Sequence, residues 1–418
     1  MTTYHTSVVN TGGFLGPAIY QPLVGWVLYI SSHGATFGPL HARTFTVCFR
    51  LGPGEEFPMN TIAGLQQRKC DSNIARVRRF VSLALLLPSG LALHTASAAE
   101  FTLMPSPQTV HIGHFAASVK PVLTIESGDF VTVESAAAME PAAIDQSGVV
   151  APSAVPEYVR AIYRDVKDRG PGPHVLTGPI AIKGAMPGDV LELRILDVSL
   201  AVDYGYNRQR PYTGALPEEF TALWQRIIPI NREAKTAEVA KGVVVPLTRP
   251  FFGTMGVAPH ASMGRISSGP PGVHSGNMDN KDLGAGATLY LPIHTPGALF
   301  SVGDAHAAQG HGEVDLSAIE TGLRGKFQFI LRKDMKLVWP RAETATHWIV
   351  MGLNPSLEEA MKIAVRETID FITRRFPHLT REEAYMIASV AVDYHVTQVV
   401  DGTKGIHGMI PKAIFTGR

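Results

Sequence analysis

The chain is almost free of cysteine. Its 418 residues include only two, Cys48 and Cys70, and there is none from Ala98 onward. The part of the chain that follows can therefore form no disulfide and offers neither a thiolate metal ligand nor a cysteine nucleophile. This absence removes the cysteine hydrolases and the thiolate metal sites from consideration.

Other common signatures are missing as well. The sequence has no G-x-S-x-G elbow of serine hydrolases, no glycine-rich phosphate loop and no dinucleotide-binding fingerprint. The formal net charge is only +1, which gives no indication of a nucleic-acid partner. Hydrophobic residues make up 45% and charged residues 17%, which predicts a globular chain with a sizeable core. The length predicts two or three domains.

An apolar stretch has the features of a secretory signal. Arginines at positions 76, 78 and 79 precede an apolar run over residues 80–93, and Ala96-Ser97-Ala98 matches an A-x-A cleavage site. The run is too short for an ordinary transmembrane helix. A buried core helix is the alternative interpretation.

The signal starts far from the first residue. We interpret residues 59–98 as a signal peptide that begins at Met59, and residues 1–58 as an over-extended start or a poorly ordered extension. No cysteine follows the apolar run, so a lipoprotein anchor is not expected. The pair Arg78-Arg79 leaves general secretory and twin-arginine export open. We expect a periplasmic or secreted protein with no membrane contact after cleavage.

Two segments repeat one pattern, a Gly-Asp turn followed by alternating β-branched or aliphatic residues. Gly128-Asp129 precedes residues 130–135, and Gly188-Asp189 precedes residues 190–196. Both patterns indicate β-hairpins of an all-β barrel or sandwich. A short helix is expected near residues 157–167, and residues 203–245 look polar and irregular.

The second half divides into a loop-rich region and a helical region. Residues 250–315 are dense in Gly, Pro, His, Asp and Asn, which predicts ordered loops that carry a site. Asn354 is expected to cap a helix, and Thr380-x-x-Glu383 is a capping box for a second one. A strand is expected over residues 397–400.

We therefore predict a mainly β fold with a C-terminal α+β part. Its domains are an N-terminal β domain over residues 99–250 and, over residues 251–418, a site-bearing β region followed by the α+β region.

Residues 276–313 concentrate side chains that can do chemistry. These are Asp279, Asp282, His294, Asp304, His306, Gln309, His311 and Glu313. Asp304 and His306 are two residues apart, so on a strand they would share a face. Mixed carboxylates and imidazoles suit Zn²⁺, Mn²⁺ or Fe²⁺, and a set richer in oxygen suits Ca²⁺. No regular metal motif is present, so hydrogen-bonding struts in tight turns remain the alternative.

The other histidines differ in their local context. His111 and His114 would face opposite sides of a strand, which favours interior positions. His174 and His274 flank turns and remain open between a site and a turn. Three more lie beside or within predicted helices and are assigned structural roles: His347, His378 and His395.

The same segments resemble the acetamidase/formamidase family. The most specific are SGNMDNKDLGAG, from Ser275, and GDAHAAQGHGE, from Gly303. Similar segments cover nearly the whole mature chain in order: residues 109–135, 172–196, 249–259, 267–321 and the C-terminal tail. His114 departs from the family pattern, which more often has an aromatic or small polar residue at this place. The leader departs as well, since many members look cytoplasmic.

The resemblance implies a β-rich homo-oligomer that hydrolyses a short linear amide to a carboxylate and ammonia. With no thiol or serine motif, water is the expected nucleophile, activated by a divalent metal ion, Zn²⁺ or Ca²⁺. The hypothesis assigns residues as follows: Asp279, Asp304 and His306 bind metal, with His174 as a further ligand; Glu313 is the general base, with Asp282 next; Asn277 or Gln309 orients the substrate.

Two alternatives stay open: hydrolysis of another C–N bond, in a cyclic imide or a formylated amine, and a secreted binding protein on the same scaffold. Between Gly276 and Glu313 there are few large side chains except Tyr290 and Phe300, so we expect amides of one to three carbons to be preferred.

Overall fold

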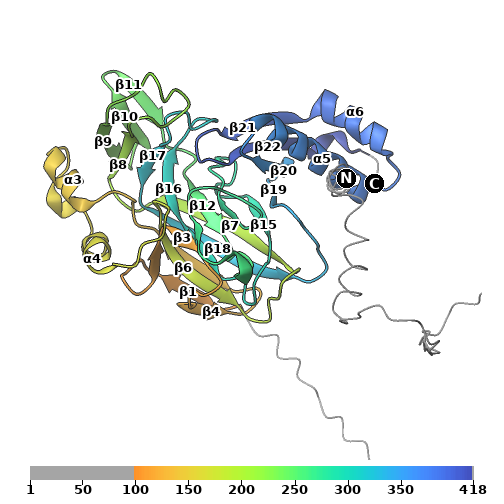
Figure 1. Cartoon of the computed structure of the whole chain (residues 1–418), viewed down its shortest axis with the longest axis horizontal. Coiled ribbons are helices and arrows are strands. Elements are labelled where there is room, and N and C mark those ends of the chain that lie inside the picture. Colours follow the sequence, from red (N-terminus) through yellow and green to blue (C-terminus); the bar gives the residue numbers. More distant parts are fainter. Residues whose placement is uncertain (1–97, 417–418) are drawn as a thin grey trace, which may run out of the picture. The chain divides into compact units, whose positions relative to one another are not determined.

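The computed structural model describes residues 98–416, and its main feature is a pair of large β-sheets (Figure 1). The predicted leader and extension lie outside the described residues. The first sheet has nine strands, in the spatial order β1 (Glu100–Leu103), β5 (Phe130–Glu134), β18 (Leu323–Arg332), β7 (Val190–Leu200), β15 (Thr288–Pro292), β19 (Arg341–Glu343), β20 (His347–Asn354), β22 (Lys404–Pro411) and β21 (Asp393–Gln398).

The second sheet is larger and more irregular. Its main path runs β11 (Val243–Pro246), β10 (Thr236–Ala240), β9 (Trp224–Asn231), β8 (Tyr204–Gln209), β17 (Ile319–Thr321), β16 (Phe300–Ala308), β12 (Phe251–Gly256) and β14 (Ser275–Asn277). Off this path β6 (Val175–Ile182) pairs with β16, and it also pairs with β2 (Val110–Ile112) and β4 (Leu123–Ile125). A small separate pair joins β13 (Ile266–Ser267) to β3 (His114–Phe115).

The two sheets share one hydrophobic core. Leu193 and Phe327 of the first sheet pack in the same buried cluster as Ile180 and Val302 of the second. Burial of this many aliphatic and aromatic side chains is the main source of stability. The predicted mainly β fold is thus confirmed, in the form of a sandwich.

The two Gly-Asp turns connect different sheets and do not form hairpins, so that prediction was wrong. β4 lies in the second sheet and β5 in the first, and the same change of sheet occurs between β6 and β7. In each turn the aspartate caps the backbone: Asp129 Oδ2 accepts the N–H of Glu126, and Asp189 Oδ2 accepts the N–H of Met186. A turn closed by its own side chain needs no neighbouring strand partner.

Residues 203–245 are also more regular than predicted. They form β8 to β11, and β8 pairs with β9 along its whole length, from Tyr204↔Pro229 to Gln209↔Trp224. The first residues of β9 are exposed, so apolar alternation there is weak and the sequence hides the strand. Strands from both sides of residue 250, where the sequence places a domain boundary, pair with one another: β7 with β15, and β6 with β16.

The C-terminal part adds helices to one end of the first sheet, where α5 (Leu357–Arg375) and α6 (Arg381–Ala391) lie over β20 and β22 (Figure 1). The capping box of α6, Thr380 with Glu383, is confirmed. The N-cap of α5 is Ser356 and not Asn354, which ends β20. Strand β21 begins at Asp393, so His395 lies on a strand.

The remaining helices are short: α3 (Pro141–Ser147), α4 (Glu157–Asp165), and the 3-10 turns η1 (Pro152–Ala154), η2 (Ala261–Met263) and η3 (Lys412–Ile414). α4 agrees with the helix predicted near residues 157–167. Among residues 98–416, no helix combines the length and the apolar character needed to cross a membrane.

Candidate active site

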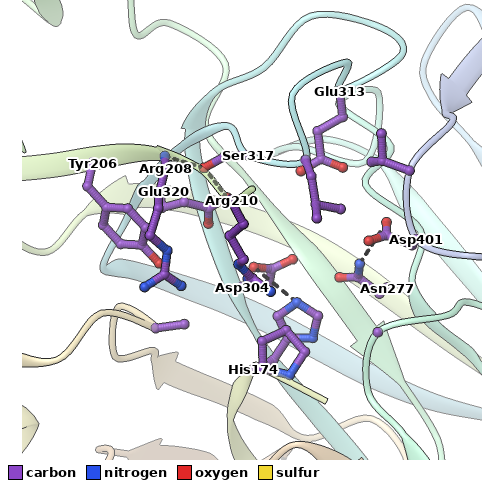
Figure 2. A pocket seen from close by; sticks show the side chains of 15 residues that line it. His174, Tyr206, Arg208, Arg210, Asn277, Asp304, Glu313, Ser317, Glu320 and Asp401 are labelled. Carbon is purple, nitrogen blue, oxygen red and sulfur yellow. Dashed lines mark hydrogen bonds and ion pairs between the residues drawn. The ribbon is translucent and has the colours of Figure 1, made fainter. Parts of the chain in front are cut away.

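A polar cavity of about 210 Å³ lies beside β16 and β17 and next to the turn that follows β21; Figure 2 shows the side chains that line it. Its polar lining comes from segments far apart in the sequence: His174, Tyr206, Arg208, Arg210, Asn277, Asp304, Glu313, Ser317, Glu320 and Asp401. Most of these side chains carry charge or a hydrogen-bonding group, so the cavity suits a small polar ligand.

Strand β16 brings Asp304 and His306 to the same side because it turns over in its middle. Phe300 and Val302 point into the core, and so do Ala305 and Ala307, which have the opposite parity. The change occurs at Asp304, whose φ is +54°. Asp304 and His306 therefore face the cavity side together, with His306 Nε2 3.4 Å from Asp304 Oδ2.

The ring of His306 is fixed by Gln309. Gln309 Nε2 donates to the backbone oxygen of Asp279, so its Oε1 accepts the Nδ1 hydrogen of His306, at 2.7 Å. In the neutral ring Nε2 then carries the lone pair. This atom is buried, lacks a hydrogen-bond partner and lies 3.3 Å from a carboxylate oxygen of Glu320 as well. A lone pair facing two carboxylates is unstable unless a proton or a cation lies between them.

His174 repeats this arrangement from the other side. Its Nδ1 lies 3.0 Å from the backbone oxygen of Ser268, which can only accept, so Nδ1 carries the hydrogen. Its Nε2 lies 3.6 Å from Asp304 Oδ1. Both histidines thus aim Nε2 at Asp304 while the other ring nitrogen is held, as in histidine metal ligands.

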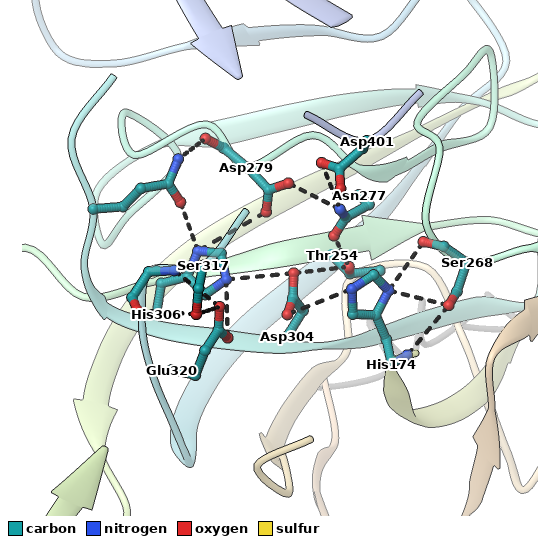
Figure 3. Close-up of polar contacts among 12 residues, drawn as sticks. His174, Thr254, Ser268, Asn277, Asp279, Asp304, His306, Ser317, Glu320 and Asp401 are labelled. Carbon is teal, nitrogen blue, oxygen red and sulfur yellow. Dashed lines mark hydrogen bonds and ion pairs between the residues drawn. The ribbon is translucent and has the colours of Figure 1, made fainter. Parts of the chain in front are cut away.

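A hydrogen-bonded row completes the far side of the site (Figure 3). Asn277 Nδ2 donates to Asp279 Oδ2 at 2.9 Å and to Asp401 Oδ2 at 3.1 Å. The other oxygen of Asp279, Oδ1, is buried without a partner, and so is Oε2 of Glu313. One atom each of Asp279, His306 and Glu313 lie within 4.8 Å of one another, and the same holds for Asp304, His306 and Glu320.

Gly253 on β12 leaves the space in which these groups meet. A Cβ at this position would lie 2.6 Å from Asp304 Oδ2 and 2.7 Å from His306 Cε1, and would also collide with Asp279 Oδ1. Any side chain larger than hydrogen would therefore fill the centre of the cluster.

The burial of so many acids changes their proton affinities. Burial, with added repulsion from other carboxylates, raises the pKa of Asp279 and of Glu313 well above the usual range. Burial also raises the pKa of Asp401 to about 6. Burial alone would raise the pKa of Asp304 too, but its interactions with His174 and His306 outweigh burial and lower that pKa.

These observations fit a cation. Asp279, His306 and Glu313 each have one buried atom without a partner, and ligand atoms of these three residues lie close together; the donors are carboxylate oxygens and an imidazole nitrogen. A cation there would relieve the repulsion among the carboxylates and satisfy the lone pair of His306.

The structure brings together most of the residues singled out in the sequence: Asn277, Asp279, Asp304, His306, Gln309, Glu313 and His174. It places others elsewhere. Asp282 and His311 belong to a separate group with His395 and His407. His294 Nε2 contacts the backbone oxygen of Val273. Tyr290 hydrogen-bonds Glu343 and Phe300 lies in the core, so neither limits the cavity.

Sequence reasoning missed Gly253, Glu320 and Asp401, and it also missed four residues of the cavity lining: Tyr206, Arg208, Arg210 and Ser317. Glu320 is a lone acid in an apolar context, and Asp401 looks like an ordinary Asp-Gly turn. Gly253, beside Phe252, carries no local signal at all. The pairing of β12 and β17 with β16 puts Gly253 and Glu320 in the site, so only the fold reveals them.

Comparisons with known proteins point to one family. The model of the Acetamidase/Formamidase family matches residues 114–269 and 265–417. The chain is 27% identical over 202 residues to a putative formamidase of Schizosaccharomyces pombe and 26% identical over 293 residues to an acetamidase of Mycolicibacterium smegmatis. These matches cover 35% and 54% of this chain.

The alignments span 49% of the length of the formamidase and 68% of that of the acetamidase. A solved structure of a predicted acetamidase/formamidase from Thermoanaerobacter tengcongensis is matched more fully. It is 27% identical with a TM-score of 0.64, over 76% of this chain and 97% of that one.

Proposed function

The chain belongs to the acetamidase/formamidase family, and on that premise we propose that it is an amidohydrolase that cleaves short linear amides to a carboxylate and ammonia. One structural observation supports this activity in addition to membership of the family. A small polar cavity is lined by buried carboxylates and by His174, which aims Nε2 at Asp304, as the fully buried His306 does from behind the lining. Hydrolysis of an amide needs an activated water, a stabilised oxyanion and a proton for the leaving nitrogen.

Glu313 is the general base in this proposal. Its Oε2 has no partner, it lines the cavity, and burial raises its pKa, which makes its carboxylate a stronger base. The carboxylate accepts a proton from the attacking water and returns it to the departing nitrogen. Asp282, the next candidate in the sequence, is instead engaged by Arg249 and His407.

Asn277 and Asp401 orient the substrate. Both line the cavity and are hydrogen-bonded to each other, and Asp401 can accept an N–H of the amide. Gln309 does not reach the cavity. It acts one step back, since it holds the ring of His306.

Asp279, Asp304 and His306 hold a divalent metal ion, with His174 as a further ligand. When bound, the ion supplies Lewis-acid polarisation of the carbonyl and a lowered pKa of water. The support is the buried Asp279 Oδ1 and His306 Nε2 without partners and the space that Gly253 leaves for a ligand. The donor set of carboxylates and imidazoles suits Zn²⁺ better than Ca²⁺.

The size of the cavity favours small substrates. It measures about 210 Å³ and is bordered by Tyr206, Leu316 and Val400. We expect amides of one to three carbons to be preferred over aromatic or peptide amides. Each methylene contributes only about 1–3 kcal/mol, so the preference is graded among short chains.

Ammonia release from formamide, acetamide, propionamide and a cyclic imide tests the reaction. Turnover of the linear amides supports the proposal. Turnover of the imide alone assigns the other C–N bond, and no turnover of any of them favours a binding protein.

A chelator tests the metal. It should abolish activity, and a divalent ion should restore it. Asp304→Asn should lower metal content without unfolding the protein, whereas Asp334→Asn, which is paired with Arg332 away from the cavity, should not. Full activity of the metal-free enzyme would assign these residues to acid–base roles.

A further inference from the structure

A second cluster of potential metal ligands lies apart from the cavity. It consists of Asp282 in the loop after β14, His311 in the loop after β16, His395 on β21 and His407 on β22. One ligand atom from each lies within 4.8 Å of all the others. His395 and His407 are direct partners in the register of β21 and β22, so their side chains share one face of the sheet.

The three imidazoles of this cluster are packed against one another. Ring centroids are 4.5 Å apart for His311 and His395, and 5.2 Å apart for the other two pairs. Asp282 Oδ2 lies 3.2 Å from His407 Nε2 and 3.9 Å from His311 Nε2. Three histidines rarely converge on one carboxylate without a shared ligand, because each ring needs its own hydrogen-bond partners.

The outer atoms of the cluster are already engaged. Thr397 Oγ1 lies 2.7 Å from His407 Nδ1, and Arg249 Nη2 donates to Asp282 Oδ1 at 2.7 Å. The inner atoms, His407 Nε2 and Asp282 Oδ2, are hydrogen-bonded to each other at 3.2 Å, so a metal ion would take the place of the proton between them. Such support from outer groups is typical of metal ligands. His395 Nδ1 is buried and has no partner.

The protonation states also suit metal binding. Burial lowers the pKa of His311 to about 4, and it lowers the pKa of His407 in the same direction. Hydrogen bonds from His407 and Arg249 outweigh burial and lower the pKa of Asp282. Near neutral pH His311 and His407 are thus uncharged and Asp282 is ionised, the forms that bind a metal ion.

We propose that Asp282, His311, His395 and His407 bind a second divalent cation of the zinc class. Three imidazole nitrogens and one carboxylate oxygen form a complete tetrahedral set, which is the pattern of a structural site rather than a catalytic one. No ligand is shared with the cluster in the cavity.

The ion would cross-link the loop that contains Glu313 to the C-terminal part of the chain, which contains Asp401. Backbone hydrogen bonds already join the two, from Gly312 N–H to the oxygen of Thr397 and from Val399 N–H to the oxygen of Gly312. His311 and the two β-strand histidines add a side-chain link at the same place. This positioning role rests on the proposed function, whereas binding of the ion does not.

The test measures bound zinc on the full chain, with Zn²⁺ alone as the probe. His306→Gln removes a ligand of the cavity cluster, so in this background one equivalent of tight zinc should remain. Adding His395→Gln should weaken it by more than about tenfold, the least expected from loss of even an outer partner. His378→Gln, at an exposed histidine outside both clusters, is the matched control.

A spectroscopic readout identifies the site. Co²⁺ substituted for Zn²⁺ in the His306→Gln protein should show the visible absorption of tetrahedral coordination, and His311→Gln should remove it. In the wild-type background His395→Gln should lower kcat for acetamide with little change in KM.

Undiminished zinc binding and an unchanged Co²⁺ spectrum after substitution of His311 and His395 would overturn the proposal. So would zinc affinity in the His306→Gln background no higher than that of surface histidines. Both outcomes are measured without turnover, so they are independent of whether the chain hydrolyses amides.

Discussion

Replacing Gly253 by alanine should lower activity, because the added methyl group would displace the side chains of Asp279, Asp304 and His306. The added Cβ would lie 2.6 Å from Asp304 Oδ2 and 2.7 Å from His306 Cε1. Ordinary contact needs about 3.5 Å, so these groups must move by about 1 Å. A displacement of that size at reacting groups lowers the rate by about 10²-fold. Forcing a methyl into a packed site also costs about 1–3 kcal/mol of stability.

The assay is kcat/KM for acetamide by ammonia release, together with the melting temperature and the bound metal. We expect kcat/KM to fall by about two orders of magnitude in a protein that remains folded. Gly310→Ala is the control, because a Cβ at that position meets no atom within 4 Å. An unchanged kcat/KM in the Gly253→Ala variant would refute the view that Asp279, Asp304 and His306 meet in the space beside Gly253.

Three further predictions concern the base, acid stability and processing. Glu313→Gln should keep the fold and the metal while lowering the rate by about 10²–10⁴-fold; a much smaller loss, seen in single-turnover ammonia release, would move the base elsewhere. Burial lowers the pKa of His111 to about 3 from 6.5, so the unfolded chain takes up the proton first and stability falls as pH drops below 6.5. The loss is about 2 kcal/mol at pH 5, and denaturation of His111→Asn should show a weaker pH dependence. N-terminal sequencing of exported protein should find Ala99 or Glu100 first, and a start near Met1 or Met59 would contradict the leader.

The sequence predicts the class of fold better than its connections. The strand pattern after Gly188-Asp189 appears as β7, and the capping box at Thr380 begins α6. Both are local signals, in which the residues that cause the structure are close in sequence. Which sheet a strand joins is decided by distant packing, and the two Gly-Asp turns are the clearest example.

The residues of the site likewise divide into those that a local sequence pattern indicates and those that only distant packing brings in. Asp304 and His306 lie on one strand, so their spacing is enough to indicate a shared face. Asp401 lies in the turn after β21, more than ninety residues later, and lines the cavity, where it accepts a hydrogen bond from Asn277. His395 lies on a strand and not beside a helix, since β21 begins at Asp393. No local pattern announces its contact with His311.

The backbone conformation of three acidic residues at the site lowers the stability of the protein, although the proposed activity depends on these residues. Asp279, Asp304 and Glu313 have φ values of +50°, +54° and +44°, which cost about 1 kcal/mol each for residues that carry a Cβ. Their buried charges add repulsion. In the metal-free protein, exchange of Asp279 for asparagine removes a buried charge, and exchange of Glu313 for glycine removes both the charge and the Cβ, so such variants should melt at a higher temperature than the wild type while losing activity. Selection of this protein for heat resistance alone would therefore remove its chemistry first.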